Sequence, residues 1–111
     1  LTGSIIISTP QDVALIDAIK AINMFKKVNV PILGIVENMS YFLCDSCNKK
    51  HEIFSSGQVK KEAEKFNIPF LGYLPLDVDL RIFSDIGKPI GIEKPNSEIA
   101  EIYLSIADKI N

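Results

Sequence analysis

The sequence has few of the residues that build metal cages and disulfide frameworks. Its 111 residues include two cysteines, one histidine and no tryptophan. A structural zinc site takes four cysteine or histidine ligands, and small disulfide scaffolds need several cysteine pairs. The two cysteines are separated by only two residues, so a disulfide between them would constrain little of the unfolded chain. We therefore expect neither a self-contained metal cage nor a structural disulfide.

A surplus of positive charge and long apolar runs are also missing. The formal net charge is −2, which argues against nucleic acid as a partner because phosphate backbones attract strongly basic surfaces. The longest apolar stretches, residues 4–9 and 30–36, are too short to cross a bilayer. There is no signal-peptide pattern, and the chain begins at Leu1 instead of a methionine. We expect a cytoplasmic protein whose first residues are missing.

The motifs of phosphoryl transfer are absent as well. The Walker A pattern Gly-x4-Gly-Lys-Ser/Thr holds phosphates through backbone N–H groups and a lysine. Here Gly87-Lys88 is followed by proline, and Ile82 stands where the upstream glycine belongs. Neither a strand ending in a metal-binding aspartate nor a Ser-His-Asp arrangement can be identified. Hydrolysis of a nucleotide by this chain alone is therefore not expected.

What is present is a regular alternation of strands and helices. Apolar, β-branched runs predict buried strands at residues 4–8, 32–36 and 70–74. Helical spacing predicts helices over about 10–28, 55–66, 78–86 and 97–110. This order is typical of an α/β fold with a parallel sheet flanked by helices. Three strands make a narrow sheet, which fits half of a doubly wound domain better than a whole one, so we treat residues 1–111 as part of a single domain.

The first predicted helix has two notable features. Thr9 is a suitable N-cap, Pro10 fits the first helical position, and Asp12 could complete a capping box. The apolar residues of the helix cover more than one packing face: Val13, Leu15, Ile16, Ala18, Ile19, Ile22 and Phe25. We interpret this width as deep packing between layers. The alternative is a helix that also contacts a partner subunit.

The strongest local signal is Cys44-Asp45-Ser46-Cys47, within a stretch of about residues 37–54 that does not follow the alternation. Loops of this length in compact domains are usually functional. Two intervening residues let both sulfurs bind one metal site, but iron–sulfur clusters normally take four thiolates. One chain thus supplies half a site, and a two-fold dimer supplies the other half. His51 is a conceivable third ligand, although it is more simply a surface residue.

Two alternatives to a cluster site stay open. The cysteine pair could bind zinc, or no metal at all, in a dimerisation or interaction module without carrier activity. It could also exchange disulfides, but reactive pairs of that kind begin a helix directly after a strand. No helix start is evident at Cys44, so thiol exchange ranks last.

Several motifs, in this order and spacing, resemble the Mrp/ApbC family of MinD-like, deviant-Walker P-loop ATPases that carry iron–sulfur clusters. They are residues 6–17 (IISTPQDVALID), residues 34–42 (GIVENMSYF), the pair Cys44 and Cys47, residues 51–54 (HEIF) and residues 70–77 (FLGYLPLD). The resemblance extends over essentially residues 1–90. It implies that the chain is the C-terminal half of a doubly wound P-loop NTPase-like domain.

The resemblance also implies a function and specific site residues. Cys44 and Cys47 of two subunits would bridge a [4Fe–4S] cluster in a homodimer, which passes it to client apoproteins. Asn38 and the segment Pro75-Leu76-Asp77 would line an adenine pocket, although a strand-end turn and a helix cap are their simpler roles. Family members carry their Walker A loop and magnesium-binding aspartate upstream of the matching segment. ATP and magnesium would therefore belong to the full-length protein.

Overall fold

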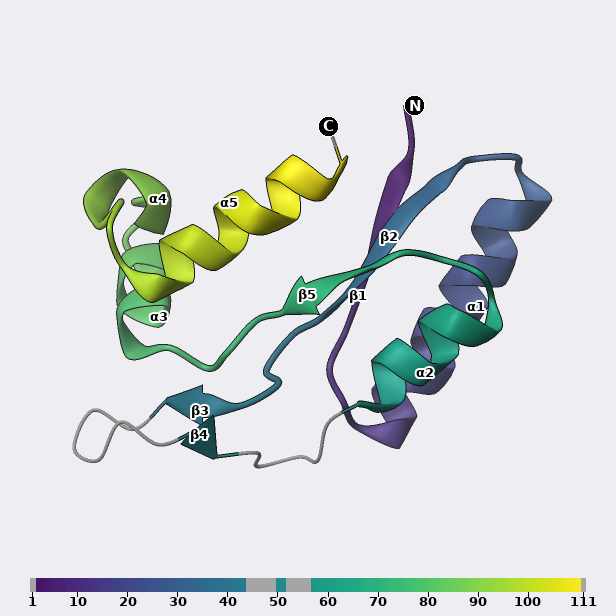
Figure 1. The fold of residues 1–111 in the computed structure, drawn as a ribbon, viewed down its shortest axis with the longest axis horizontal. Helices are drawn as coiled ribbons and strands as arrows, with labels where there is room; N and C mark the ends of the chain where they lie inside the picture. Colours follow the sequence, from purple (N-terminus) through teal and green to yellow (C-terminus); the bar gives the residue numbers. More distant parts are fainter. Residues whose placement is uncertain (1, 44–49, 52–56, 111) are drawn as a thin grey trace.

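The computed structural model describes residues 2–43, 50–51 and 57–110. A parallel sheet in the order β1-β2-β5 forms its centre (Figure 1). The strands are β1 (Ser4–Ser8), β2 (Ile32–Glu37) and β5 (Phe70–Tyr73). All three lie where the apolar runs predict them, and both pairings are parallel, as expected.

Helices pack on both faces of this sheet. On one side lie α1 (Asp12–Lys27) and α2 (Gln58–Lys65), and on the other lie α3 (Val78–Asp85), α4 (Ile90–Glu93) and α5 (Glu98–Ile110) (Figure 1). The predicted α/β architecture is therefore confirmed. The expected start of the second helix, at residue 55, lies outside the described residues. Helix α4 has no counterpart in the sequence prediction.

The central strand β2 separates two hydrophobic cores. Successive residues of a strand point to opposite faces, and Ile35 and Val36 accordingly belong to different cores. The first core lies under α1 and α2 and contains Ile6, Ala18, Ile22, Ile35, Val59, Ala63 and Ile68. The second lies under α5 and contains Val36, Leu71, Leu74, Ile90, Ile99 and Ile106.

Two expectations for the first helix are wrong. Helix α1 begins at Asp12, and its N-cap is Gln11, with extended backbone and no side-chain cap. The Thr9 hydroxyl donates to the Gln11 side chain instead of capping the helix. The helix is also not enclosed between layers. Val13 and Ile16 are 76% and 55% exposed, so these two additional apolar residues face outward, whereas Ile19 is partly buried.

The helix ends agree with the sequence. Helices α1, α2 and α3 each stop at a residue with left-handed backbone, namely Asn29, Asn67 and Gly87. In α1, the N–H groups of Asn29 and Val30 donate back to the carbonyls of Lys26 and Phe25. This pattern satisfies the last carbonyls of a helix. The following proline prevents the helix from continuing.

A short hairpin interrupts the stretch that was expected to be a loop. Strands β3 (Phe42–Leu43) and β4 (Lys50–His51) pair antiparallel and form a separate two-stranded sheet. It lies beside α3, at the end of the molecule away from α1 (Figure 1). Among the described residues, no helix is both long and apolar enough to span a bilayer.

Candidate functional site

The Cys-x-x-Cys motif is connected to the hairpin at both of its ends. Cys44 and Cys47 belong to residues 44–49, which lie outside the described residues, so their role as ligands stays a prediction. The backbone before and after them is described: Leu43 pairs with Lys50, and Phe42 pairs with His51. The hairpin therefore determines where the cysteine segment leaves and rejoins the fold.

The hairpin is joined to the carboxyl end of β5. The Leu76 N–H donates to the Tyr41 carbonyl at 2.7 Å, and the Ser40 N–H donates to the Leu74 carbonyl at 2.9 Å. Phe42 continues this pairing as a parallel bridge to Leu76. Main-chain hydrogen bonds of this kind hold the direction of a segment firmly. The position of β3 thus follows from the position of the sheet.

Glu37, the last residue of β2, is fully buried at 0% exposure. One carboxylate oxygen accepts a hydrogen bond of 2.5 Å from the Ser40 hydroxyl, and the other accepts one of 3.3 Å from the Gly57 N–H. Ser40 precedes the hairpin, and Gly57 follows the segment that returns from it. The Glu37 carboxylate therefore connects both ends of the cysteine-bearing segment to the sheet.

Glu37 was not identified as a site residue from the sequence. A signal was available, because an acidic residue ends the otherwise apolar run 32–36. A carboxylate buried in a protein must be compensated by hydrogen bonds or a countercharge. Its partner at residue 57 is 20 positions away along the chain, and no local pattern reveals such a pairing.

Asn38 forms the turn that leaves the central strand. Its N–H donates to the Ser8 carbonyl at 2.8 Å, and its side-chain oxygen accepts the Met39 N–H at 2.9 Å. Met39 has a φ of 55°, in the left-handed region that non-glycine residues rarely adopt. The expected strand-end turn is confirmed. The contact with adenine stays a prediction.

Pro75 and Asp77 lie at the same end of the sheet as Asn38. The Leu74 N–H, next to Pro75, donates to the Glu37 carbonyl at 2.8 Å. The carboxyl ends of β1, β2 and β5 thus meet here, and in open α/β sheets ligands bind outside these strand ends. Asp77 accepts the Leu80 N–H at 2.8 Å and caps α3, as expected.

Replacing Asp77 by alanine should destabilise the chain by about 1 kcal/mol, because α3 loses its N-cap. Replacement by asparagine should cost much less, since the amide oxygen can accept the same Leu80 N–H. Urea denaturation of the two variants measures this difference. An equal loss in both variants would mean that the charge of Asp77, and not its cap, is what stabilises the helix.

Tyr41 lines a cavity of about 280 Å³ between the end of β5 and α5. Burial, and then the negative charge of Glu98, raise the pKa of the Tyr41 phenol. The hydroxyl therefore remains neutral at physiological pH. Lys109 of α5 also lines the cavity and donates to the Leu71 carbonyl at 2.8 Å. This hydrogen bond joins α5 to β5 beside the cavity.

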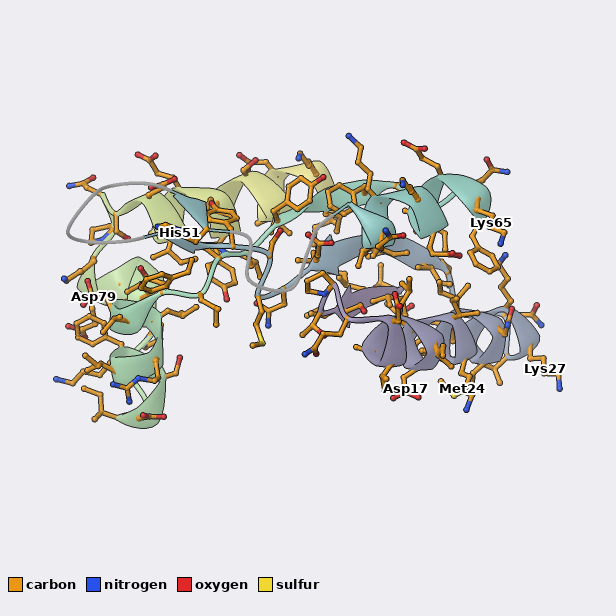
Figure 2. The ribbon with its side chains drawn as sticks, turned by 90° about the horizontal axis from the view of Figure 1, so that it is seen from below. Asp17, Met24, Lys27, His51, Lys65 and Asp79 are labelled. Atoms are coloured by element: carbon orange, nitrogen blue, oxygen red, sulfur yellow. The ribbon has the colours of Figure 1, made fainter. Side chains whose placement is uncertain are left out.

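His51 is exposed in β4, opposite Phe42. Figure 2 shows it at the same end of the molecule as Asp79 of α3, and far from Lys27 and Lys65 of α1 and α2. Within residues 2–43, 50–51 and 57–110, no group of three or more His, Cys, Asp or Glu side chains could hold a metal ion. The exposure of His51 agrees with the expectation of a surface residue, and the alternative role as a third ligand stays a hypothesis.

Comparison with known proteins finds relatives whose names agree with one another. Residues 1–111 match the family described as ParA: NUBPL iron-transfer P-loop NTPase. The "Iron-sulfur cluster transfer protein NUBPL" of Dictyostelium discoideum is 52% identical over 110 residues, which are 99% of this chain and 34% of that protein. The "Iron-sulfur cluster carrier protein" of Escherichia coli (strain K12) is 48% identical over 99% of this chain and 30% of its own length. The chain thus spans about a third of these relatives.

Solved structures agree on the fold. A nucleotide-binding protein from Archaeoglobus fulgidus, in complex with ADP, superposes with a TM-score of 0.73 at 36% identity, over 90% of this chain and 40% of that chain. The cell division ATPase MinD of Pyrococcus furiosus superposes with a TM-score of 0.75 over 98% of this chain and 42% of that chain. Its 24% identity supports the fold alone. The match over the whole chain shows that it belongs to the family of NUBPL iron-transfer P-loop NTPases.

Proposed function

We propose that this chain is the cluster-holding part of an iron–sulfur cluster carrier, and that it forms the C-terminal part of a single P-loop NTPase domain. The observation that carries this proposal is the attachment of the Cys-x-x-Cys segment, whose two ends are joined to the sheet through the hairpin and Glu37. The family match and the names of the relatives support it. Cys44 and Cys47 are the cargo ligands.

The number of cysteine ligands requires a second copy of the chain. Two thiolates per chain cannot satisfy a [4Fe–4S] cluster, which is normally held by four. A two-fold dimer brings the same two cysteines together twice, because an isologous interface apposes equivalent surfaces. The cluster is then shared between the subunits of a homodimer. Each subunit holds only half of the ligands, which suits cargo that must be released.

Release to a client apoprotein is an exchange of ligands. Cysteine thiolates of the client replace Cys44 and Cys47, so the cluster keeps its coordination throughout. The neighbouring hairpin residue His51 is exposed, as access by a client requires. Free thiols persist in a reducing compartment, and we accordingly place the carrier in the cytoplasm.

ATP and magnesium enter through residues outside this chain. The sequence contains no Walker A loop, so it has no cradle for the phosphates. Asn38, Pro75 and Asp77 are proposed to lie beside the adenine instead. Their place at the carboxyl edge of the sheet supports this assignment. The Archaeoglobus protein was solved in complex with ADP, which supports nucleotide binding by a full-length relative.

Anaerobic reconstitution with ferrous iron and sulfide tests the cysteine site. The chain should take up one cluster per two chains, measured by iron and sulfide analysis and by the visible absorption of the cluster. Cys44→Ala and Cys47→Ala should each abolish this uptake, because a half-site with one thiolate cannot complete the coordination. His51→Ala is the matched control and should retain the cluster.

Two outcomes would contradict the proposal. Cysteine variants that bind the same amount of cluster as the unaltered chain would exclude Cys44 and Cys47 as ligands. Zinc that stays bound to both thiolates after aerobic purification, with no uptake of iron and sulfide, would favour an interaction module stabilised by zinc. Metal analysis of the purified protein distinguishes these cases directly.

A further inference from the structure

Helix α3 has an apolar row on its outer face. Leu80 and Phe83 point inward and pack against the second hydrophobic core. The outer residues Val78, Ile82 and Ile86 are 44%, 42% and 58% exposed. They are four positions apart, so they form one line along the helix and its C-cap. An amphipathic helix normally turns such a row toward a partner.

A charged pair flanks this row. Arg81 and Asp85 lie 3.3 Å apart, and their side chains are 68% and 67% exposed. A pair with this exposure contributes little to the stability of its own helix. Both residues point away from the core on the same side of the apolar row, because each lies one position before Ile82 or Ile86.

The outer surface of α3 continues toward the cysteine hairpin. An apolar groove of about 350 Å³ is lined by Phe42, Leu76, Asp77, Val78 and Arg81. Phe42 belongs to β3, and Cys44 follows two residues later. A partner bound along α3 would therefore lie next to the hairpin that carries the proposed ligands.

This surface is complementary to itself. If two copies of α3 pack antiparallel across a two-fold axis near Ile82, Val78 of one copy meets the partner's Ile86 and the two Ile82 side chains meet each other. A two-fold rotation of this kind places the charged residues of both helices on the same side of the shared apolar row. Arg81 of one copy then faces the partner's Asp85, and the same contact occurs a second time. Opposite charges that alternate in this way determine the direction and the register of pairing.

We propose that α3 is the surface through which two copies of this chain associate, antiparallel and with reciprocal contacts between Arg81 and Asp85. The proposed function enters this proposal at one point: the contact through α3 would bring two Cys-x-x-Cys segments together. The face of β1 opposite Ile6 also exposes apolar residues, Ile5 and Ile7. It carries no charged residue within Ser4–Ser8, so nothing there selects a second copy.

The contact is small, and the association should be weak. Stable dimers bury about 800 Å² per partner, more than one eight-residue helix and a groove supply. We expect dimers to form at protein concentrations of roughly 100 µM, and a shared cluster would then hold them together. Sedimentation equilibrium of the chain without metal measures this association.

Charge reversal gives a specific test. Arg81→Asp places four carboxylates at the interface, and Asp85→Arg places four guanidinium groups there. Each variant alone should dimerise about tenfold more weakly than the unaltered chain. An equimolar mixture of the two variants should restore dimers, because the two carboxylates of one variant then face the two guanidinium groups of the other. A variant that carries both substitutions should also dimerise, since the exchanged charges remain complementary.

Further variants separate the interface from folding. Ile82→Glu should prevent association, whereas Val13→Glu, on the exposed face of α1, should leave it unchanged. Circular dichroism verifies that each variant is folded. A chain that stays monomeric, single variants that dimerise normally, or a mixture that does not recover would each overturn the proposal. Because no iron is present, these outcomes leave the cysteine proposal standing, and cysteine variants that lose the cluster leave the α3 contact standing.

Discussion

Replacing Gly34 by alanine is expected to destabilise the chain by about 1–3 kcal/mol, the usual cost of overpacking a core. A Cβ atom at this position would lie 2.4 Å from the Cγ atom and 2.6 Å from the Cδ1 atom of Leu71. Leu71 is only 2% exposed in the second core, so it has little room to move. The loss should be visible as a lower midpoint of urea denaturation.

The clash has its origin in the pairing of β2 with β5. Ile35 pairs with Phe70 and Val36 pairs with Gly72, so Leu71 occupies an irregularity in the register. Its side chain lies over Gly34, where only a glycine leaves enough room. The same strand ends in Glu37, and a displaced β2 would therefore also disturb the attachment of the cysteine segment.

A control and a double variant make this prediction specific. Gly91→Ala, in α4, introduces a methyl group with no atom within 4 Å, and it should be neutral or slightly stabilising. If the contact with Leu71 is the cause, Gly34→Ala combined with Leu71→Ala should cost less than the sum of the single changes. Strictly additive losses would contradict this explanation.

Replacing Glu37 by alanine is expected to destabilise the chain by about 2–4 kcal/mol. It would leave the buried Ser40 hydroxyl and the Gly57 N–H without the carboxylate that accepts their hydrogen bonds. An unsatisfied buried donor costs about 1–3 kcal/mol, and the empty volume of the side chain adds to this loss. Chemical denaturation measures the total, and hydrogen exchange at the Gly57 amide measures the local effect.

Comparison of variants separates the hydrogen bonds from packing. Glu37→Gln keeps the volume and one acceptor, so it should cost less than alanine. In a double-mutant cycle with Ser40→Ala, the two losses should be coupled by about 0.5–3 kcal/mol. Glu101→Gln, on the exposed side of α5, is the control and should have little effect. Unchanged exchange at Gly57 in Glu37→Ala would show that the carboxylate does not hold the returning segment.

The loss of Glu37 should also affect the proposed cargo site. The carboxylate connects the approach to the hairpin with the segment that returns from it. Without it, the two sides of the cysteine segment lose one connection, and the backbone pairing of β3 and β4 remains. A folded Glu37→Gln variant should therefore hold a reconstituted cluster at least as long as a folded Glu37→Ala variant does.

The strands and the helix ends could be predicted because their causes are local. Residues 32–36 and 70–74 are apolar without alternation, which is expected of strands covered on both faces. Residues 4–8 also form the expected strand, but the expected burial on both faces is wrong, because Ile5 and Ile7 are 37% and 60% exposed. Asn29, Asn67 and Gly87 tolerate left-handed backbone and end three helices. The predicted start of α1 was wrong because Gln11 keeps an extended backbone and the helix begins only at Asp12. Sequence patterns place helix ends less reliably than the helices themselves.

Sequence by itself determined the fold class, the Cys-x-x-Cys motif and the cap at Asp77, since each depends on residues within a few positions of one another. Only the tertiary structure decided what holds the cysteine segment: the hairpin of β3 and β4, the pairing of Tyr41 and Phe42 with Leu76, and the buried carboxylate of Glu37. It also decided that Val13 and Ile16 of α1 and the row Val78, Ile82 and Ile86 of α3 face outward. These features depend on contacts between segments far apart in the chain, and packing, not local propensity, selects such contacts.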